Sequence, residues 1–102
     1  MLGVSGETLE IHGAVSQQTA EEMAQEVRRL MNADIGLSDT GVAGPSGGTP
    51  QKPVGLFYIG ISSSLGTRAV RHVFGGDRLE NKEAAARAAL GMLKEHLLGL
   101  GR

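Results

Sequence analysis

Apolar side chains recur with helical spacing between residues 16 and 32. They are Ala20, Met23, Ala24, Val27, Leu30 and Met31. Their i, i+3, i+4, i+7 spacing predicts one buried stripe on a helix, and charged or amide side chains fill the other positions. Ser16 is the expected N-cap, with Thr19 and Glu22 as an alternative capping box. Asn32 is the expected end of the helix.

Two further apolar stretches predict a pair of strands. Residues 54–61, VGLFYIGI, are apolar on both faces, which indicates a central strand covered from two sides. Residues 67–74, TRAVRHVF, follow the short turn SSSLG at 62–66 and are expected to form a hairpin with the first strand. The arginines and histidine of this second strand favour a place at the sheet edge. A short strand is expected over 33–38, whereas residues 1–15 show no period and are expected to be irregular.

The last part of the chain predicts a long helix. Asp77 is the expected cap, with Glu80 three residues later. The expected apolar stripe consists of Ala86, Leu90, Leu93 and Leu97, with Ala85, Ala88 and Ala89 allowing close packing. Gly99 and Gly101 are expected to end the helix. The order helix, strand, loop, strand, strand, helix predicts one small α/β domain over residues 1–102.

The composition excludes several classes of protein. The chain has a net charge of -1, which implies no basic face, and only 3% aromatic residues, so a nucleic-acid partner is not expected. There is no cysteine, which excludes disulfides, thiolate metal sites and cysteine nucleophiles and fits a reducing cytoplasm. Apolar runs are far shorter than the roughly 18 residues of a membrane span, so no membrane association is expected.

The stretch DTGVAGPSGGTP at 39–50 is the most distinctive feature of the sequence. Glycine reaches positive φ at low cost and lets a ligand approach the main chain. Successive N–H groups in such a loop can converge on an anion, and Thr40, Ser46 and Thr49 would add hydroxyl groups. The known phosphate-loop signatures are absent, and prolines favour extended conformations. On this basis, a ligand-binding loop and a structural turn are equally expected.

Other polar residues carry weaker signals. Arg78 could pair with a phosphate or carboxylate, or form a surface salt bridge, and Lys52 could reach an anion or be solvated. Asp39 could orient a ligand or bond local backbone. The three histidines lack metal-ligand spacing, so no metal site is expected; His96 is expected to face solvent on the last helix and His12 to have a structural role. No catalytic set stands out by spacing.

The order of these motifs resembles the C-terminal domain of CinA, the competence/damage-inducible protein family, which also occurs alone as nicotinamide mononucleotide deamidase. The resemblance lies in HGAVSQQTAEEMA, ADIGLSDTGVAGPSGGTPQKPVGLFYIG and GGDR, and spans nearly the whole chain. It implies a three-layer α/β/α fold with a mixed sheet. It also implies a hydrolase, in which a serine nucleophile with a lysine base converts nicotinamide mononucleotide to nicotinate mononucleotide and ammonia without a cofactor.

The resemblance also implies which residues bind the nucleotide. The matching positions are Thr40, Gly41, Ala43, Gly44, Gly47, Gly48 and Arg78. The family's serine and lysine lie in an upstream segment, and Met1 follows the point where that lysine would lie. The chain is therefore expected to lack catalytic residues and to be inactive alone. Covering the exposed sheet edge would then require a homo-oligomer or a separate N-terminal half. A non-catalytic nucleotide-binding or oligomerising module is the alternative.

Two positions depart from the family pattern. Asp39 stands where the family usually has an apolar residue before Thr-Gly, and this charge could alter the pocket or the strand end. Lys82 stands where many members have an arginine, which weakens an anion contact at that position.

Overall fold

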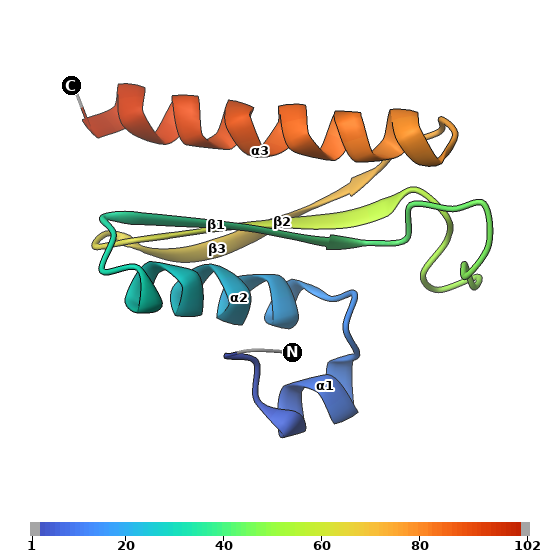
Figure 1. Cartoon of the computed structure of the whole chain (residues 1–102), viewed down its shortest axis with the longest axis horizontal. Helices are drawn as coiled ribbons and strands as arrows, with labels where there is room; N and C mark the ends of the chain where they lie inside the picture. Colours follow the sequence, from blue (N-terminus) through green and yellow to red (C-terminus); the bar gives the residue numbers. More distant parts are fainter. Residues whose placement is uncertain (1–2, 101–102) are drawn as a thin grey trace.

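The computed structural model describes residues 3–100 and places a sheet between helices. The elements in chain order are α1 (Gly6–His12), α2 (Gln17–Leu30), β1 (Ile35–Gly41), β2 (Leu56–Ser63), β3 (Gly66–Val73) and α3 (Arg78–Leu100). Helix α2 covers one face of the sheet, α3 covers the other, and α1 lies beyond α2 (Figure 1). This arrangement confirms the expected three-layer α/β/α architecture.

The sheet has the strand order β1-β2-β3, so β2 is central and β3 lies at an edge, as predicted. Both pairings are antiparallel, and Ile61 of β2 pairs with Leu37 on one side and Arg68 on the other. The expectation of a mixed sheet is wrong for the described residues, because none of these strands has a parallel neighbour. The predicted five-residue turn is also shorter, since Ser63 still pairs with Gly66 and only two residues connect the strands.

Helix α2 packs closely on the sheet through small residues. Ser16 caps it as predicted, and the Ser16 hydroxyl accepts a hydrogen bond from the Thr19 amide at 3.1 Å. Ala20 is fully buried, and a Cβ added to Gly60 of β2 would lie only 2.5 Å from its carbonyl oxygen. The predicted stripe is wrong beyond Ala24, because Val27, Leu30 and Met31 are exposed.

Helix α1 corrects the expectation that residues 1–15 are irregular. At its N-terminus, the Ser5 hydroxyl accepts a hydrogen bond from the Thr8 amide at 3.0 Å. At its C-terminus, the Gly13 amide donates to the Leu9 carbonyl at 3.0 Å. Seven residues make only two turns, which is too short for a buried period to appear in the sequence. Met1 and Leu2 lie outside the described residues.

Helix α3 begins as predicted but turns a different face inward. Asp77 and Glu80 form the expected capping box, with hydrogen bonds of 2.9 and 3.1 Å to each other's amides. The inward face consists of Asn81, Ala85, Ala88, Ala89 and Met92. The predicted stripe is wrong, because Leu90 and Leu97 are exposed. Gly99 lies inside the helix, and Gly101 lies outside the described residues.

The hydrophobic core lies between β2 and α3. Phe57, Ile59 and Ile61 are buried and pack against Ala85 and Met92. No helix in the described residues is both long enough and apolar enough to pass through a bilayer.

Candidate functional site

The candidate site is the connection between β1 and β2, and two of its expected residues belong to the sheet instead. Thr40 and Gly41 form the end of β1. The buried Thr40 hydroxyl donates to the Ala14 carbonyl at 2.7 Å, so it anchors the chain before α2. A Cβ on Gly41 would lie 2.3 Å from the Phe57 ring, so this glycine is required for packing.

The start of α3 holds the loop in place. The fully buried Asn81 amide nitrogen donates to the Ala43 carbonyl at 3.0 Å, and its oxygen accepts from the Gly76 amide at 2.9 Å. Arg78 donates from Nη1 to the Gly44 carbonyl at 3.1 Å. Arg78 is thus brought into contact with the adjacent pair Ala43 and Gly44, although it lies 34 positions after Gly44 in the sequence.

Sequence reasoning missed Asn81. Its only signal is its position, four residues before Ala85 on the same helix face. A polar side chain on a buried helix face is hydrogen-bonded in folded proteins, so it indicates a fixed contact with a loop or strand. That signal could have been found only with knowledge that the alanines, and not the leucines, turn inward.

The loop glycines have different reasons for being glycine. Gly44 has φ +96°, and a Cβ there would lie 2.7 Å from Val54 Cγ1. Gly48 is equally confined, with Val54 N at 2.7 Å. Gly47 has φ +95°, but the nearest atom to an added Cβ is 3.9 Å away. Gly47 is therefore needed for its backbone conformation in open space, whereas Gly44 and Gly48 are needed because Val54 packs against them.

The loop presents unpaired amides to solvent. The internal bonds of this segment run from Thr49 N to Lys52 O at 2.9 Å, from Lys52 N to Thr49 Oγ1 at 3.0 Å and from Gly55 N to Val42 O at 2.6 Å. Among the described residues, no acceptor lies on the backbone N–H of the exposed Ser46, Gly47 and Gly48, or on that of Gly44, which is buried. Exposed N–H groups in a positive-φ turn are the donors that hold anions in protein loops.

Other residues considered from the sequence lie in varied surroundings. Lys52 donates from Nζ to the His12 carbonyl at 2.7 Å, so its ammonium group joins the loop to the end of α1. Asp39 is exposed on β1, and Lys82 is exposed on α3. The expectation for His96 is wrong, because it is half-buried and its Nε2 atom is buried without a partner in the described part of the chain.

Several of the described hydroxyls make structural hydrogen bonds, as the following serines show. Ser5 and Ser16 cap helices, and Ser38 donates to the Ala20 carbonyl at 2.6 Å. Ser62 and Thr67 share a hydrogen bond of 2.8 Å. Across residues 3–100, no serine hydroxyl is hydrogen-bonded to a lysine. Nor do three histidine, aspartate or glutamate side chains gather there to hold a metal ion.

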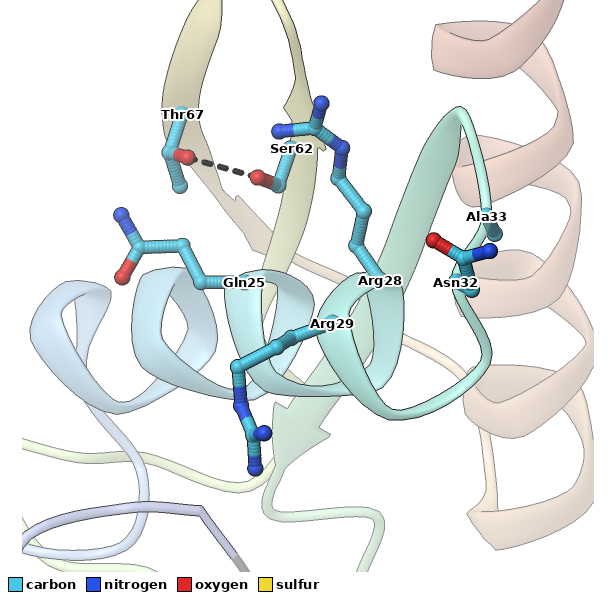
Figure 2. A pocket seen from close by; sticks show the side chains of 7 residues that line it. All are labelled: Gln25, Arg28, Arg29, Asn32, Ala33, Ser62 and Thr67. Carbon is cyan, nitrogen blue, oxygen red and sulfur yellow. Dashed lines mark hydrogen bonds between the residues drawn. The ribbon is translucent and has the colours of Figure 1, made fainter.

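A second hollow lies at the opposite end of the sheet, and Figure 2 shows it from close by. It has a volume of about 370 Å³ and is lined by Gln25, Arg28, Arg29, Asn32, Ala33, Ser62 and Thr67. Arg28 extends toward Ser62, whereas Arg29 points away and pairs with Glu26 (Figure 2). The end of α2 presents carbonyl oxygens here, which disfavour an anion. This hollow is less suited to a phosphate than the glycine loop.

The sequence model of the CinA C-terminal domain matches residues 1–97. A CinA-like protein from Desulforapulum autotrophicum is 51% identical over 102 residues, and one from Kosmotoga olearia is 48% identical over 99 residues. These matches cover 99% and 97% of this chain but only 24% of each relative. The chain thus spans about a quarter of the length of these relatives.

Solved structures agree with this match. The competence damage-inducible protein A (ComA) from Klebsiella pneumoniae superimposes with a TM-score of 0.89 at 36% identity. The competence/damage inducible protein CihA from Agrobacterium tumefaciens superimposes with a TM-score of 0.85 at 41% identity. The matches cover 95% and 93% of this chain and 60% and 59% of the solved chains. By sequence and by fold, the chain belongs to the CinA C-terminal domain family.

Proposed function

We propose that this chain forms the nucleotide-binding part of an amidohydrolase that converts nicotinamide mononucleotide to nicotinate mononucleotide and ammonia. The observation that carries the proposal is the set of unpaired, exposed amides at Ser46, Gly47 and Gly48, in the loop that Arg78 contacts at Gly44. A phosphomonoester is a dianion near neutral pH, and it is recognised well by several backbone N–H groups together with one guanidinium. Resemblance to the family supplies the identity of the substrate.

Arg78 has two tasks in this proposal. One N–H holds the Gly44 carbonyl, and a guanidinium has five N–H donors, so others are left for the phosphate. Arg78 stands in the first turn of α3. Asn81 keeps the loop against this turn, so the donors are in place before the ligand arrives.

Hydrolysis needs groups that the described residues do not bring together. Acyl transfer requires a nucleophile within hydrogen-bond reach of a base, and no serine–lysine pair of this kind is present in residues 3–100. We therefore expect the 102-residue chain to bind the nucleotide without releasing ammonia. Turnover would require a polypeptide that supplies the serine and the lysine.

Calorimetric titration with nicotinamide mononucleotide and with nicotinamide riboside, which lacks the phosphate, tests the proposal. The mononucleotide should bind more tightly. Arg78→Ala should weaken its binding by about tenfold or more, because a hydrogen bond to a charged group contributes about 1.5–3 kcal/mol. The same variant should leave riboside binding nearly unchanged, which separates phosphate contact from general loosening of the loop.

Arg87→Ala is the matched control, since Arg87 is exposed on the same helix and has no hydrogen bond in the described part of the chain. It should bind both ligands like the unmodified chain. Equal affinity for mononucleotide and riboside, or no binding of either, would contradict the proposal. Ammonia release by the chain alone would show that it carries a nucleophile.

A further inference from the structure

Residues 12–14, where α1 ends and the chain turns toward α2, are held by side chains from three parts of the molecule. We call these residues the α1–α2 junction. The start of α2 holds one carbonyl of the junction, since the hydroxyls of Ser16 and Thr19 donate to Gly13 O at 3.1 and 2.7 Å. The end of β1 holds the next carbonyl through the hydroxyl of Thr40. These contacts fix the junction to the sheet and to α2.

The remaining carbonyl of the junction is held by the glycine loop. Lys52 Nζ donates to the His12 carbonyl at 2.7 Å, across 40 positions of sequence. We call this contact the Lys52 tie. A Cβ added to Gly13, which has φ +81°, would lie 2.7 Å from the same Nζ, so the glycine leaves room for the ammonium group. The junction and the loop lie at the same end of the sheet (Figure 1).

The backbone of Lys52 is in turn bonded to the part of the loop that carries the open amides. Thr49 N donates to Lys52 O at 2.9 Å, and Lys52 N donates to Thr49 Oγ1 at 3.0 Å. Thr49 follows directly after the exposed amides of residues 46–48. A contact that fixes Lys52 to the junction therefore also restricts the segment that carries these amides.

We propose that Lys52 is a positioning residue of the glycine loop, and that the Lys52 tie holds the amides of residues 46–48 in the arrangement that binds a phosphate. This inference rests on the proposed function and adds to it a residue that acts through the loop. A loop ordered before the ligand arrives binds with a lower entropic cost, so loss of the tie should weaken binding although every donor remains. Because coupling between two sites is reciprocal, a bound nucleotide should in turn stabilise the junction.

Hydrogen exchange of the Gly13 amide, which donates to the Leu9 carbonyl at the end of α1, tests the tie in the chain without nucleotide. Lys52→Met removes the ammonium group and keeps an unbranched side chain, so it should speed this exchange by about threefold to tenfold. Lys52→Arg keeps a charged donor and should restore most of the protection. Lys94→Met is the matched control, because Lys94 is exposed on α3, and it should leave the exchange unchanged.

Calorimetry with nicotinamide mononucleotide tests the effect of the tie on the site. Lys52→Met should raise the Kd by about threefold to tenfold, Lys52→Arg should raise it less, and Lys94→Met should not change it. Bound nucleotide should slow exchange of the Gly13 amide in the unmodified chain and not in Lys52→Met.

A second variant separates positioning from direct contact between Lys52 and the phosphate. Gly13→Ala displaces the ammonium group from the junction and leaves Lys52 in place, so it should also raise the Kd. Combining it with Lys52→Met should add little, because both changes break the same contact. Gly66→Ala is its control, since Gly66 has φ +134° and no atom within 4 Å of an added Cβ, and it should leave the Kd unchanged.

Three results would overturn the proposal. Additive losses of affinity in the double variant would show that Lys52 and Gly13 act separately. A raised Kd in Lys52→Met without faster exchange of the Gly13 amide would assign Lys52 to the phosphate itself. If Lys52→Met speeds the exchange but the unmodified chain binds no nucleotide, the proposed function fails and the tie has a structural role only.

Discussion

The two ends of the sheet differ in how their polar groups are used. At the glycine-loop end, Asn81 and Arg78 bind carbonyls of the loop, and the loop amides remain open. At the other end, Arg28 and Arg29 stand beside the carbonyl end of α2, and Arg29 already pairs with Glu26. The first end has hydrogen-bonded side chains that hold the loop and unsatisfied backbone donors, whereas the second has arginines beside the negative end of a helix dipole. A large hollow with arginines is therefore a weaker indication of an anion site than a smaller loop held by buried contacts.

The largest expected effect comes from adding one methyl group at the glycine-loop end. Gly41→Ala would place a Cβ 2.3 Å from Phe57 and 2.6 Å from the Leu56 carbonyl oxygen. We expect it to lower the free energy of unfolding by about 3 kcal/mol, because well-packed sites cannot absorb added volume. Gly91→Ala is the matched change on α3, where no atom lies within 4 Å of the added Cβ.

Gly91→Ala should raise the free energy of unfolding by about 0.8–1.0 kcal/mol through helix propensity. Urea denaturation of Gly41→Ala and Gly91→Ala measures both changes in the free energy of unfolding. Equal effects of the two substitutions would show that the end of β1 is not tightly packed.

The second effect tests the frame of the loop. Asn81→Ala removes the partners of the Ala43 carbonyl and the Gly76 amide, and should cost about 1–3 kcal/mol of stability because buried polar groups lose their hydrogen bonds. It should also weaken nucleotide binding. Arg28→Ala at the other end should change stability by about 0.5 kcal/mol or less, since Arg28 has no hydrogen-bond partner in the described residues. A larger loss of stability with Arg28→Ala than with Asn81→Ala would contradict the proposed difference between the two ends of the sheet.

The smallest expected effect is a pH dependence of the free energy of unfolding, caused by the pair of Glu26 and Arg29 on α2. The hydrogen bond and charge of Arg29 lower the pKa of Glu26 from its ordinary value of 4.5. A lowered pKa in the folded state stabilises the fold above pH 4.5, and the contribution is lost as the pH falls through the lowered value. Both groups are exposed, so the effect should be small and sensitive to salt. The unfolding free energies of the unmodified chain and Glu26→Gln should differ slightly at pH 7 and converge as the pH falls below the lowered pKa of Glu26; a difference that does not change with pH would contradict the assignment.

Strand order and helix caps could be predicted from the sequence because they depend on local patterns. The continuous apolar run around Ile59 predicts a central strand, and Ser16 and Asp77 occupy the N-cap positions. The inward face of α3 could not be predicted from the pattern of apolar residues. Leucine is more hydrophobic than alanine, so the pattern assigns the leucines to the core. Alanines lie inward because helix and sheet approach closely there, whereas Leu90 and Leu97 lie exposed on the outer side.

The candidate site was only partly predictable for a similar reason. Glycine content marks the loop, but it does not separate Gly47, which the backbone conformation requires, from Gly41, which Phe57 packing requires. The Thr40 hydroxyl donates a hydrogen bond to the Ala14 carbonyl, 26 positions away in the sequence. Asn81 acts through a partner 38 positions away. Contacts over such separations depend on the fold and leave no short motif.

Nuclear magnetic resonance with ¹⁵N-labelled chain tests most directly whether the glycine loop is the nucleotide site. On titration with nicotinamide mononucleotide, we predict that the amide resonances of Ser46, Gly47 and Gly48 shift with one Kd, together with the Arg78 side chain. The amides of Arg28 and Asn32 should stay in place. Shifts confined to Arg28 and Asn32, or no shifts at all at saturating nucleotide, would contradict this account.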